Sequence, residues 1–148
     1  MFGRGDTAIV AQMLETLRHR GPDDGHVEGD AHFAIGARRL SILDVAGGRQ
    51  PMFNERRTIC AAENGELYNY PLIRPDLERR GHHFSTHCDT EVLPHLYEEC
   101  GRDLPTRIDG MFAVAVWDRE HRQGLLARDR MGKKPLYYWQ QGEVLYFA

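Results

Sequence analysis

The sequence is poor in cysteine, has no long apolar run and carries little net charge, and each shortage excludes a class of protein. Its three cysteines are odd in number and widely spaced, which indicates reduced thiols and argues against a disulfide framework. No apolar stretch approaches the roughly 18 residues of a membrane span. The N-terminus lacks the pattern of a signal peptide, and a net charge of −3 offers no basic surface for nucleic acid or a membrane. We therefore expect a cytoplasmic protein.

The composition is that of an ordinary globular domain. The chain has 148 residues, of which 41% are hydrophobic and 28% charged. This length is enough for one domain with a core, and no repeat or low-complexity linker divides it. We expect a single domain over residues 1–148.

Helices and short strands alternate along the chain. Helical patterns cover residues 7–19, 70–80 and 90–100, with Asp6 as the expected N-cap of the first. The run from Met111 to Trp117 is continuously apolar, as in a strand buried on both faces. Strands are predicted at residues 31–35 and 39–45 on either side of Gly36, and at 58–62, 111–117, 124–128, 136–139 and 144–148. Mixed elements in one domain indicate sheets covered by helices.

Asn64-Gly65 is the most informative dipeptide, and it allows two interpretations. Asn-Gly is the strongest short signal for a hairpin turn, so a tight turn between two strands is the ordinary interpretation. In the functional interpretation, the Asn64 amide and a following backbone N–H point at one oxygen. An oxyanion formed during acyl transfer needs that pair of donors.

Two charged residues, Arg39 and Asp89, also allow two interpretations each. Arg39 is either a solvated surface residue or a bidentate partner for a carboxylate. Asp89 precedes a helical pattern, so it is either an N-cap or a receptor for an ammonium group. Together with Asn64 and Gly65, the pair would suit an α-amino acid with a reactive side-chain carbonyl.

Two further patterns point away from other kinds of site. His82, His83, His87 and Cys88 are crowded, but their spacing matches no standard zinc pattern, so we predict no metal site. The segment Gly132-Lys133-Lys134-Pro135 lacks the spacing of a phosphate-binding loop.

Taken in order, several motifs resemble the glutaminase domain of glutamine-dependent asparagine synthetases. These are class II amidotransferases of the N-terminal-nucleophile hydrolase type. Each motif is weak alone, but their order through nearly the whole chain is specific. They are Arg20-Gly21-Pro22-Asp23-Asp24, Arg39-Leu40-Ser41-Ile42, Gln50-Pro51-Met52, Asn64-Gly65-Glu66-Leu67-Tyr68-Asn69, Asp89-Thr90-Glu91, Asp109-Gly110-Met111-Phe112-Ala113, Ala127-Arg128-Asp129-Arg130 and Gly132-Lys133-Lys134-Pro135-Leu136-Tyr137-Tyr138.

The resemblance implies a fold and a set of roles. The fold is α+β, a four-layer αββα sandwich of antiparallel sheets. Asn64 and Gly65 would form the oxyanion hole, and Asp89, assisted by Glu66, would hold the α-ammonium of L-glutamine. Arg39 would grip its α-carboxylate, and the pocket would be lined by Leu40, Ser41, Ile42 and Leu43. Residues 128–138 would be structural or would contact a synthetase half.

The start of the chain departs from the family. The family nucleophile is a cysteine directly after the initiator methionine, whose own amine can act as general base, whereas this chain begins Met1-Phe2-Gly3. Either the nucleophile has been replaced, or the recorded chain begins late. The short spacing to Arg20 favours the late start and a missing first strand. We therefore expect a marginally stable polypeptide without glutaminase activity, in which Cys60, Cys88 and Cys100 do not substitute for the nucleophile.

Three functions stay open at this point. The first is a glutaminase domain that supplies ammonia to a fused synthetase domain, which amidates aspartate with ATP and magnesium; this domain itself would need no cofactor. The second is a catalytically inactive domain that senses glutamine or binds a partner. The third is the glutaminase domain of a related amidotransferase with another acceptor. A homodimer is left open in each case.

Overall fold

A computed structural model provides the structure of the chain and describes residues 1–22, 24–39 and 48–148. The helices are α1 (Thr7–Thr16), α2 (Tyr70–Arg79), α3 (Val92–Cys100) and α4 (Leu104–Arg107), with the 3₁₀ turns η1 (Asp89–Glu91) and η2 (Gly101–Asp103). The strands are β1 (Asp24–Gly29), β2 (Ala34–Arg39), β3 (Met52–Phe53), β4 (Ile59–Leu67), β5 (Gly110–Asp118), β6 (Gln123–Arg128), β7 (Tyr138–Gln141) and β8 (Val144–Phe147).

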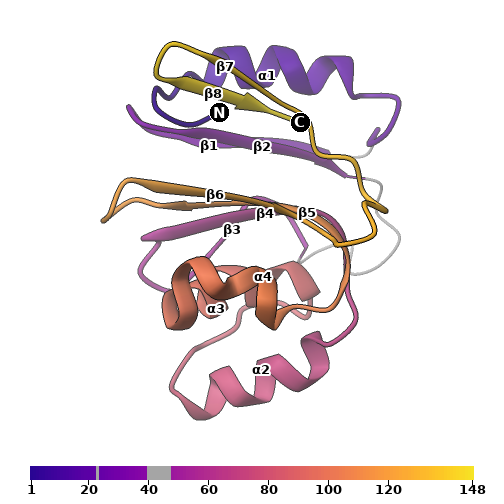
Figure 1. Cartoon of the computed structure of the whole chain (residues 1–148), viewed down its shortest axis with the longest axis vertical. Coiled ribbons are helices and arrows are strands. Elements are labelled where there is room, and N and C mark those ends of the chain that lie inside the picture. Colours follow the sequence, from indigo (N-terminus) through magenta and orange to yellow (C-terminus); the bar gives the residue numbers. More distant parts are fainter. Residues whose placement is uncertain (23, 40–47) are drawn as a thin grey trace.

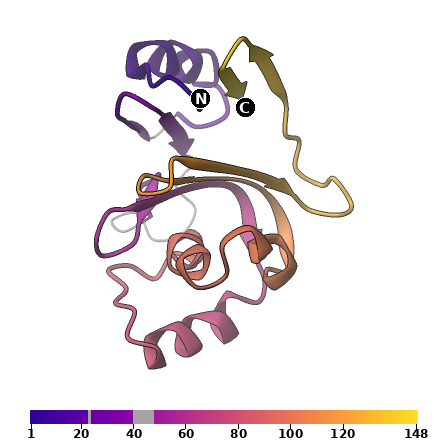
Figure 2. The same ribbon diagram turned by 60° about the vertical axis from the view of Figure 1, so that its left-hand side comes forward.

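The elements form four layers (Figure 1). Helix α1 covers one outer side, followed by the β1–β2 pair and the β7–β8 hairpin; then comes a sheet in the order β3-β4-β5-β6, with α2, α3 and α4 on the other outer side. Figure 2 shows the β7–β8 hairpin beside β1–β2 on the same side of the larger sheet. All strand pairs are antiparallel. The expected αββα sandwich is confirmed.

Phe2 joins the two small sheets into one layer. It makes antiparallel bridges to Phe33, just before β2, and to Leu145 in β8. The Phe2 N–H donates to the Leu145 carbonyl at 2.9 Å, and the Leu145 N–H donates back at 3.0 Å. Residue 2 therefore occupies a strand position in the centre of this layer.

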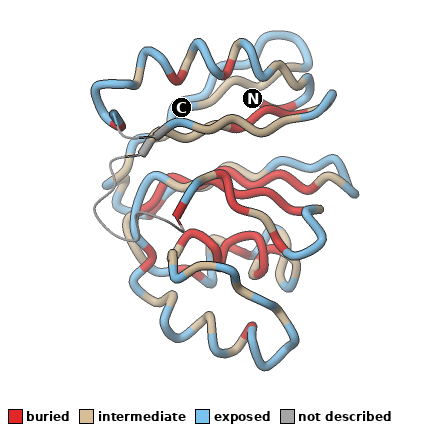
Figure 3. Tube along the Cα trace, turned by 180° about the vertical axis from the view of Figure 1, so that it is seen from behind, coloured by how far each residue is buried: buried red, intermediate tan, exposed pale blue. Residues whose placement is uncertain are grey.

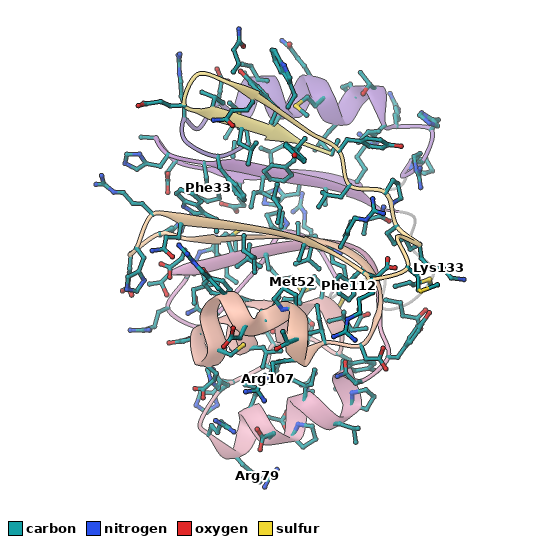
Figure 4. All side chains as sticks on the ribbon, in the orientation of Figure 1. Phe33, Met52, Arg79, Arg107, Phe112 and Lys133 are labelled. Atoms are coloured by element: carbon teal, nitrogen blue, oxygen red, sulfur yellow. The ribbon has the colours of Figure 1, made fainter. Side chains whose placement is uncertain are left out.

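Buried residues run along the larger sheet and the helices packed on it (Figure 3), and their side chains form clusters on both faces of the sheet. The face toward the helices carries one apolar cluster, in which Leu67, Val114 and Val116 pack against Leu93 of α3. The face toward the other sheet carries a second cluster built around Trp117 and Phe33, and Phe33 lies in the space between the sheets (Figure 4). The continuously apolar pattern of β5 is thus explained by burial on both faces.

The local sequence signals predicted most elements. The Asp6 carboxylate accepts hydrogen bonds from the backbone N–H groups of Ala8 and Ile9, which confirms it as the N-cap of α1. The helices at 70–80 and 90–100 and the strands at 111–117, 124–128 and 144–148 are confirmed with small shifts of their ends. Within the described residues, no helix is long and apolar enough to cross a bilayer.

Two strand predictions were wrong in detail, and β1 and β3 were missed. The break at Gly36 is absent, because Gly36 lies inside β2 and pairs with Val27. No strand was predicted at β1 or at β3. The strand expected at 136–139 begins later, at Tyr138. Most of the strand predicted at 39–45 lies outside the described residues.

Candidate functional site

Asn64 and Gly65 lie within a strand, so the predicted turn was wrong. Both belong to β4, which continues to Leu67, and they pair with Ala113 and Phe112 of β5. Asn64, Gly65 and Glu66 are exposed, whereas the preceding part of β4 is buried. The three residues therefore form an accessible strip at the end of a strand that is otherwise part of the core.

Gly65 is required because two backbones approach closely. A β-carbon at this position would lie 2.1 Å from the Met111 carbonyl oxygen and 2.7 Å from the Phe112 α-carbon. Gly110 of β5 is limited by the same close approach, since a β-carbon there would lie 2.2 Å from the Glu66 carbonyl oxygen. Glycine is thus used here for close packing of β4 against β5.

We expect Gly65→Ala to destabilise the protein by about 1–3 kcal/mol, because the strands must separate to admit the methyl group. Urea denaturation measures the free energy of unfolding. Glu66→Ala is the matched control, since its side chain is exposed, and we expect a change within about 0.5 kcal/mol. Equal stabilities for the two variants would contradict the close approach.

Asp89 is held against Leu67, the residue of β4 that directly follows the exposed strip. Its Oδ2 accepts a hydrogen bond from the Leu67 N–H at 2.9 Å, and its Oδ1 accepts from the Thr90 N–H at 2.9 Å and from the Cys88 thiol at 3.5 Å. Asp89 begins η1 rather than capping it from outside, since Cys88 is the N-cap residue. A carboxylate has about four lone-pair sites, so one remains for a cationic ligand.

A hydrogen-bond network behind the strip was missed by the sequence reasoning. The Glu63 N–H donates to Gln50 Oε1 at 2.7 Å, and Gln50 Nε2 donates to Thr90 Oγ1 at 3.2 Å. The Thr90 hydroxyl donates in turn to Glu63 Oε2 at 3.1 Å. The network ties β4, η1 and Gln50, two residues before β3, together beside Asp89. A single carboxylate after Ala61-Ala62 in a buried strand was the available signal.

Glu63 is a largely buried carboxyl group. Its Oε1 has no hydrogen-bond partner among the described residues. Burial, together with the negative charge of Asp89, raises the pKa of Glu63 to about 8. The Glu63 side chain is therefore neutral at neutral pH. It does not compete with Asp89 for a cation.

The predicted carboxylate clamp cannot be placed in the same way. The backbone of Arg39 ends β2, but its side chain lies outside the described residues, as do Leu40, Ser41, Ile42 and Leu43. The structure places Asn64, Gly65 and Glu66 consecutively in β4 and the Asp89 carboxylate on the N–H of the next residue, Leu67; the remainder of the predicted pocket stays a prediction.

Phe2 and the three cysteines lie in buried or partly buried positions. Phe2 is 6% exposed and stacks on Trp117, with 5.2 Å between ring centroids. Trp117 pairs with Cys60, four residues before Asn64 on β4, which corresponds to about 13 Å along a strand. Burial raises the pKa of Cys60 to about 12 and also raises the pKa of Cys88 and Cys100 above the usual range. These thiols are protonated at neutral pH and therefore weak nucleophiles.

A family model described as a glutamine amidotransferase domain matches residues 1–148. Asparagine synthetase [glutamine-hydrolyzing] 3 of Bacillus subtilis is 44% identical over 139 residues, covering 93% of this chain and 23% of the relative. Asparagine synthetase [glutamine-hydrolyzing] 3 of Arabidopsis thaliana is 39% identical over 142 residues, covering 94% and 24%. The chain therefore spans about a quarter of the length of these relatives.

The fold is also similar to that of solved structures. The glutamine phosphoribosylpyrophosphate amidotransferase from B. subtilis aligns with a TM-score of 0.76 at 23% identity, over 99% of this chain and 40% of that one. A second structure, described as the allosteric regulatory enzyme of purine biosynthesis, aligns with a TM-score of 0.73 at 24% identity, over 93% and 38%. At this identity the likeness concerns the fold.

Proposed function

Because the chain belongs to the glutamine amidotransferase domain family, we propose that it is the glutamine-binding domain of a longer asparagine synthetase. In that protein, ammonia from the glutamine side chain would pass to a synthetase domain that amidates aspartate with ATP and magnesium. The similarity to curated asparagine synthetases supports this choice of acceptor over another carboxylate or sugar.

The observation that carries the proposal is the hydrogen bond of the Asp89 carboxylate to the Leu67 N–H, in the same strand as Asn64 and Gly65. A carboxylate that retains a free lone pair receives the α-ammonium of glutamine. The Asn64 amide and a backbone N–H of the exposed strip then face the side-chain carbonyl, where charge develops during acyl transfer. Glu66, exposed on the same strip, adds negative charge near the ammonium.

We propose further that this polypeptide binds glutamine without hydrolysing it. Acyl transfer through a thioester needs a thiolate within reach of the carbonyl. Phe2 packs in the core, and the pKa values of the three thiols are raised. Ligand binding and turnover are thus expected to separate in this chain.

Calorimetric titration with L-glutamine tests the proposal. We expect Asp89→Asn to weaken binding about 10- to 100-fold, as for loss of a hydrogen bond between charged groups. Asp76→Asn is the matched control, because Asp76 lies on α2 and pairs with Arg79 and Arg80 at the surface. An ammonia assay should give no release above background from any of the three proteins.

A ligand without the α-amino group separates recognition from folding effects. The des-amino analogue of glutamine should bind wild type weakly, and Asp89→Asn should weaken its binding no further. If Asp89→Asn weakened both ligands equally, Asp89 would act through the fold alone. Failure of glutamine to bind wild type would overturn the proposed function.

An exposed apolar surface supports attachment to a larger protein. Met131, Tyr137, Tyr138 and Trp139 are all more than half exposed, and they follow Asp129. The Asp129 carboxylate accepts hydrogen bonds from the backbone N–H groups of Lys133 and Lys134. These hydrogen bonds lower the pKa of Asp129, and the one from Lys133 has the largest effect. We propose that this ordered segment contacts the synthetase part, since exposed apolar patches commonly mark contact surfaces.

A further inference from the structure

Glu55, His82 and His95 meet on the helix side of the larger sheet, outside the candidate glutamine site. Glu55 follows β3, His82 follows α2, and His95 lies in α3. One ligand atom from each residue lies within 4.8 Å of the others. The sequence reasoning weighed His82 with its neighbours in the chain and missed the two residues that the fold brings to it.

Two of the three separations match those around a tetrahedral cation. His82 Nδ1 lies 3.3 Å from His95 Nδ1, His95 Nδ1 lies 3.4 Å from Glu55 Oε2, and His82 Nδ1 lies 3.7 Å from Glu55 Oε1. Bonds of about 2.0–2.1 Å from a tetrahedral Zn²⁺ to its ligands place those ligands about 3.3–3.4 Å apart. The His82–His95 and His95–Glu55 separations match this spacing, whereas the His82–Glu55 separation is longer and concerns the other carboxylate oxygen. A small rotation of the Glu55 carboxylate would present one oxygen to both rings.

The surrounding hydrogen bonds aim these atoms inward. His82 Nε2 donates to Glu99 Oε1 at 3.1 Å, so the proton of the neutral ring is on Nε2 and the lone pair of Nδ1 faces the cluster. Glu99 is itself held by Arg80 at 3.0 Å. The His83 N–H donates to Glu55 and fixes that carboxylate. Partners of this kind orient metal-ligating histidines and carboxylates.

His95 is the most buried member of the three. Among the described residues, only its Nδ1 has polar partners. The side chain is 1% exposed, and its Nε2 has no hydrogen-bond partner among the described residues. Its ring lies against Phe84, with 4.4 Å between centroids. Glu55 is partly exposed, so an ion can enter past it. Two imidazoles and one carboxylate form a ligand set suited to Zn²⁺ and related ions.

We propose that Glu55, His82 and His95 bind a divalent transition-metal ion of the Zn²⁺ type, with water completing the tetrahedron. The ion joins the turn after β3, the segment after α2 and helix α3. Its role is structural, because α3 follows directly on η1, which carries Asp89. Metal binding would thus brace the segment that supports the candidate glutamine site.

Metal titration of the chelator-treated protein tests the site. We expect one equivalent of Zn²⁺ by calorimetry, and with Co²⁺ the intense visible absorption of a four-coordinate ion. His82→Gln and Glu55→Gln should each weaken binding at least 100-fold, and Glu99→Gln about 10- to 100-fold through the orientation of His82. His83→Gln is the matched control, because its side chain is exposed, and it should bind as wild type does.

Circular dichroism of the metal-free variants checks whether they fold. If a variant does not fold, the nitrogen-15 shifts of the histidine rings in the unaltered protein still report metal binding directly. The Nδ1 signals of His82 and His95 should move on addition of Zn²⁺ while those of His83 stay in place. The proposal is overturned if no ring shifts, if Co²⁺ keeps the weak spectrum of the six-coordinate ion, or if His83→Gln weakens binding as much as His82→Gln.

Discussion

Glu63→Gln should stabilise the protein strongly at alkaline pH and by only about 1 kcal/mol at pH 5. The pKa of Glu63 is raised to about 8, first by burial and then by the charge of Asp89. In the unfolded chain the same group ionises near its usual value of about 4.3. Between these values the folded state holds a proton that the unfolded state has lost, so stability falls as the pH rises from about 4.5 to about 8.

The size of the effect follows from the shift in pKa. Each unit corresponds to 1.36 kcal/mol, so the full penalty above pH 8 amounts to at most about 4–5 kcal/mol. A glutamine side chain has the same size, carries no charge and still accepts the hydrogen bond from the Thr90 hydroxyl. The variant should therefore lack the alkaline loss of stability.

Urea denaturation of both proteins at pH 5, 7 and 9 measures the difference. Glu66→Gln is the matched control, because Glu66 lies on the same strand but is exposed, and its effect on stability should not change with pH. A stability difference between Glu63→Gln and wild type that is constant from pH 5 to pH 9 would contradict a buried, protonated Glu63.

Local signals explain which parts of the fold were predictable. Asp6 lies just before an apolar pattern with helical spacing, and capping depends only on residues within one turn. The apolar run of β5 likewise reports its own burial. Asn64-Gly65 misled, because the dipeptide favours a turn locally, whereas pairing of Gly65 with Phe112 in β5 holds it extended. A contact between distant segments overrode the local preference.

The candidate site was predictable only in part for the same reason. Asn64, Glu66 and Asp89 belong to motifs whose order revealed the family. Glu63 and Gln50 gain their roles from contacts with Thr90 in η1, and no spacing in the sequence reports such contacts. The set of Glu55, His82 and His95 comes from three separated segments, so only the folded chain brings these residues together.

Phe2→Ala should cost about 3–5 kcal/mol of stability, as expected for an aromatic residue removed from a core. The Phe2 ring stacks on Trp117 at 5.2 Å and lies 4.7 Å from the Phe147 ring. Gly124 leaves room for it, since a β-carbon there would lie 2.4 Å from the Phe2 ring. Tyr137→Ala is the control, because Tyr137 is 72% exposed; its loss should cost less than about 1 kcal/mol.

Phe2→Cys extends this prediction to function. The family's nucleophile type would then stand at position 2, yet we expect no ammonia release from glutamine. The new thiol would occupy the core beside Trp117, which pairs with Cys60, and Cys60 lies about 13 Å along β4 from Asn64 at the spacing of an extended strand. It would also be buried, which raises the pKa of a thiol and keeps it protonated. Glutaminase activity in Phe2→Cys would show that position 2 reaches the exposed strip and that its place in the core is not fixed.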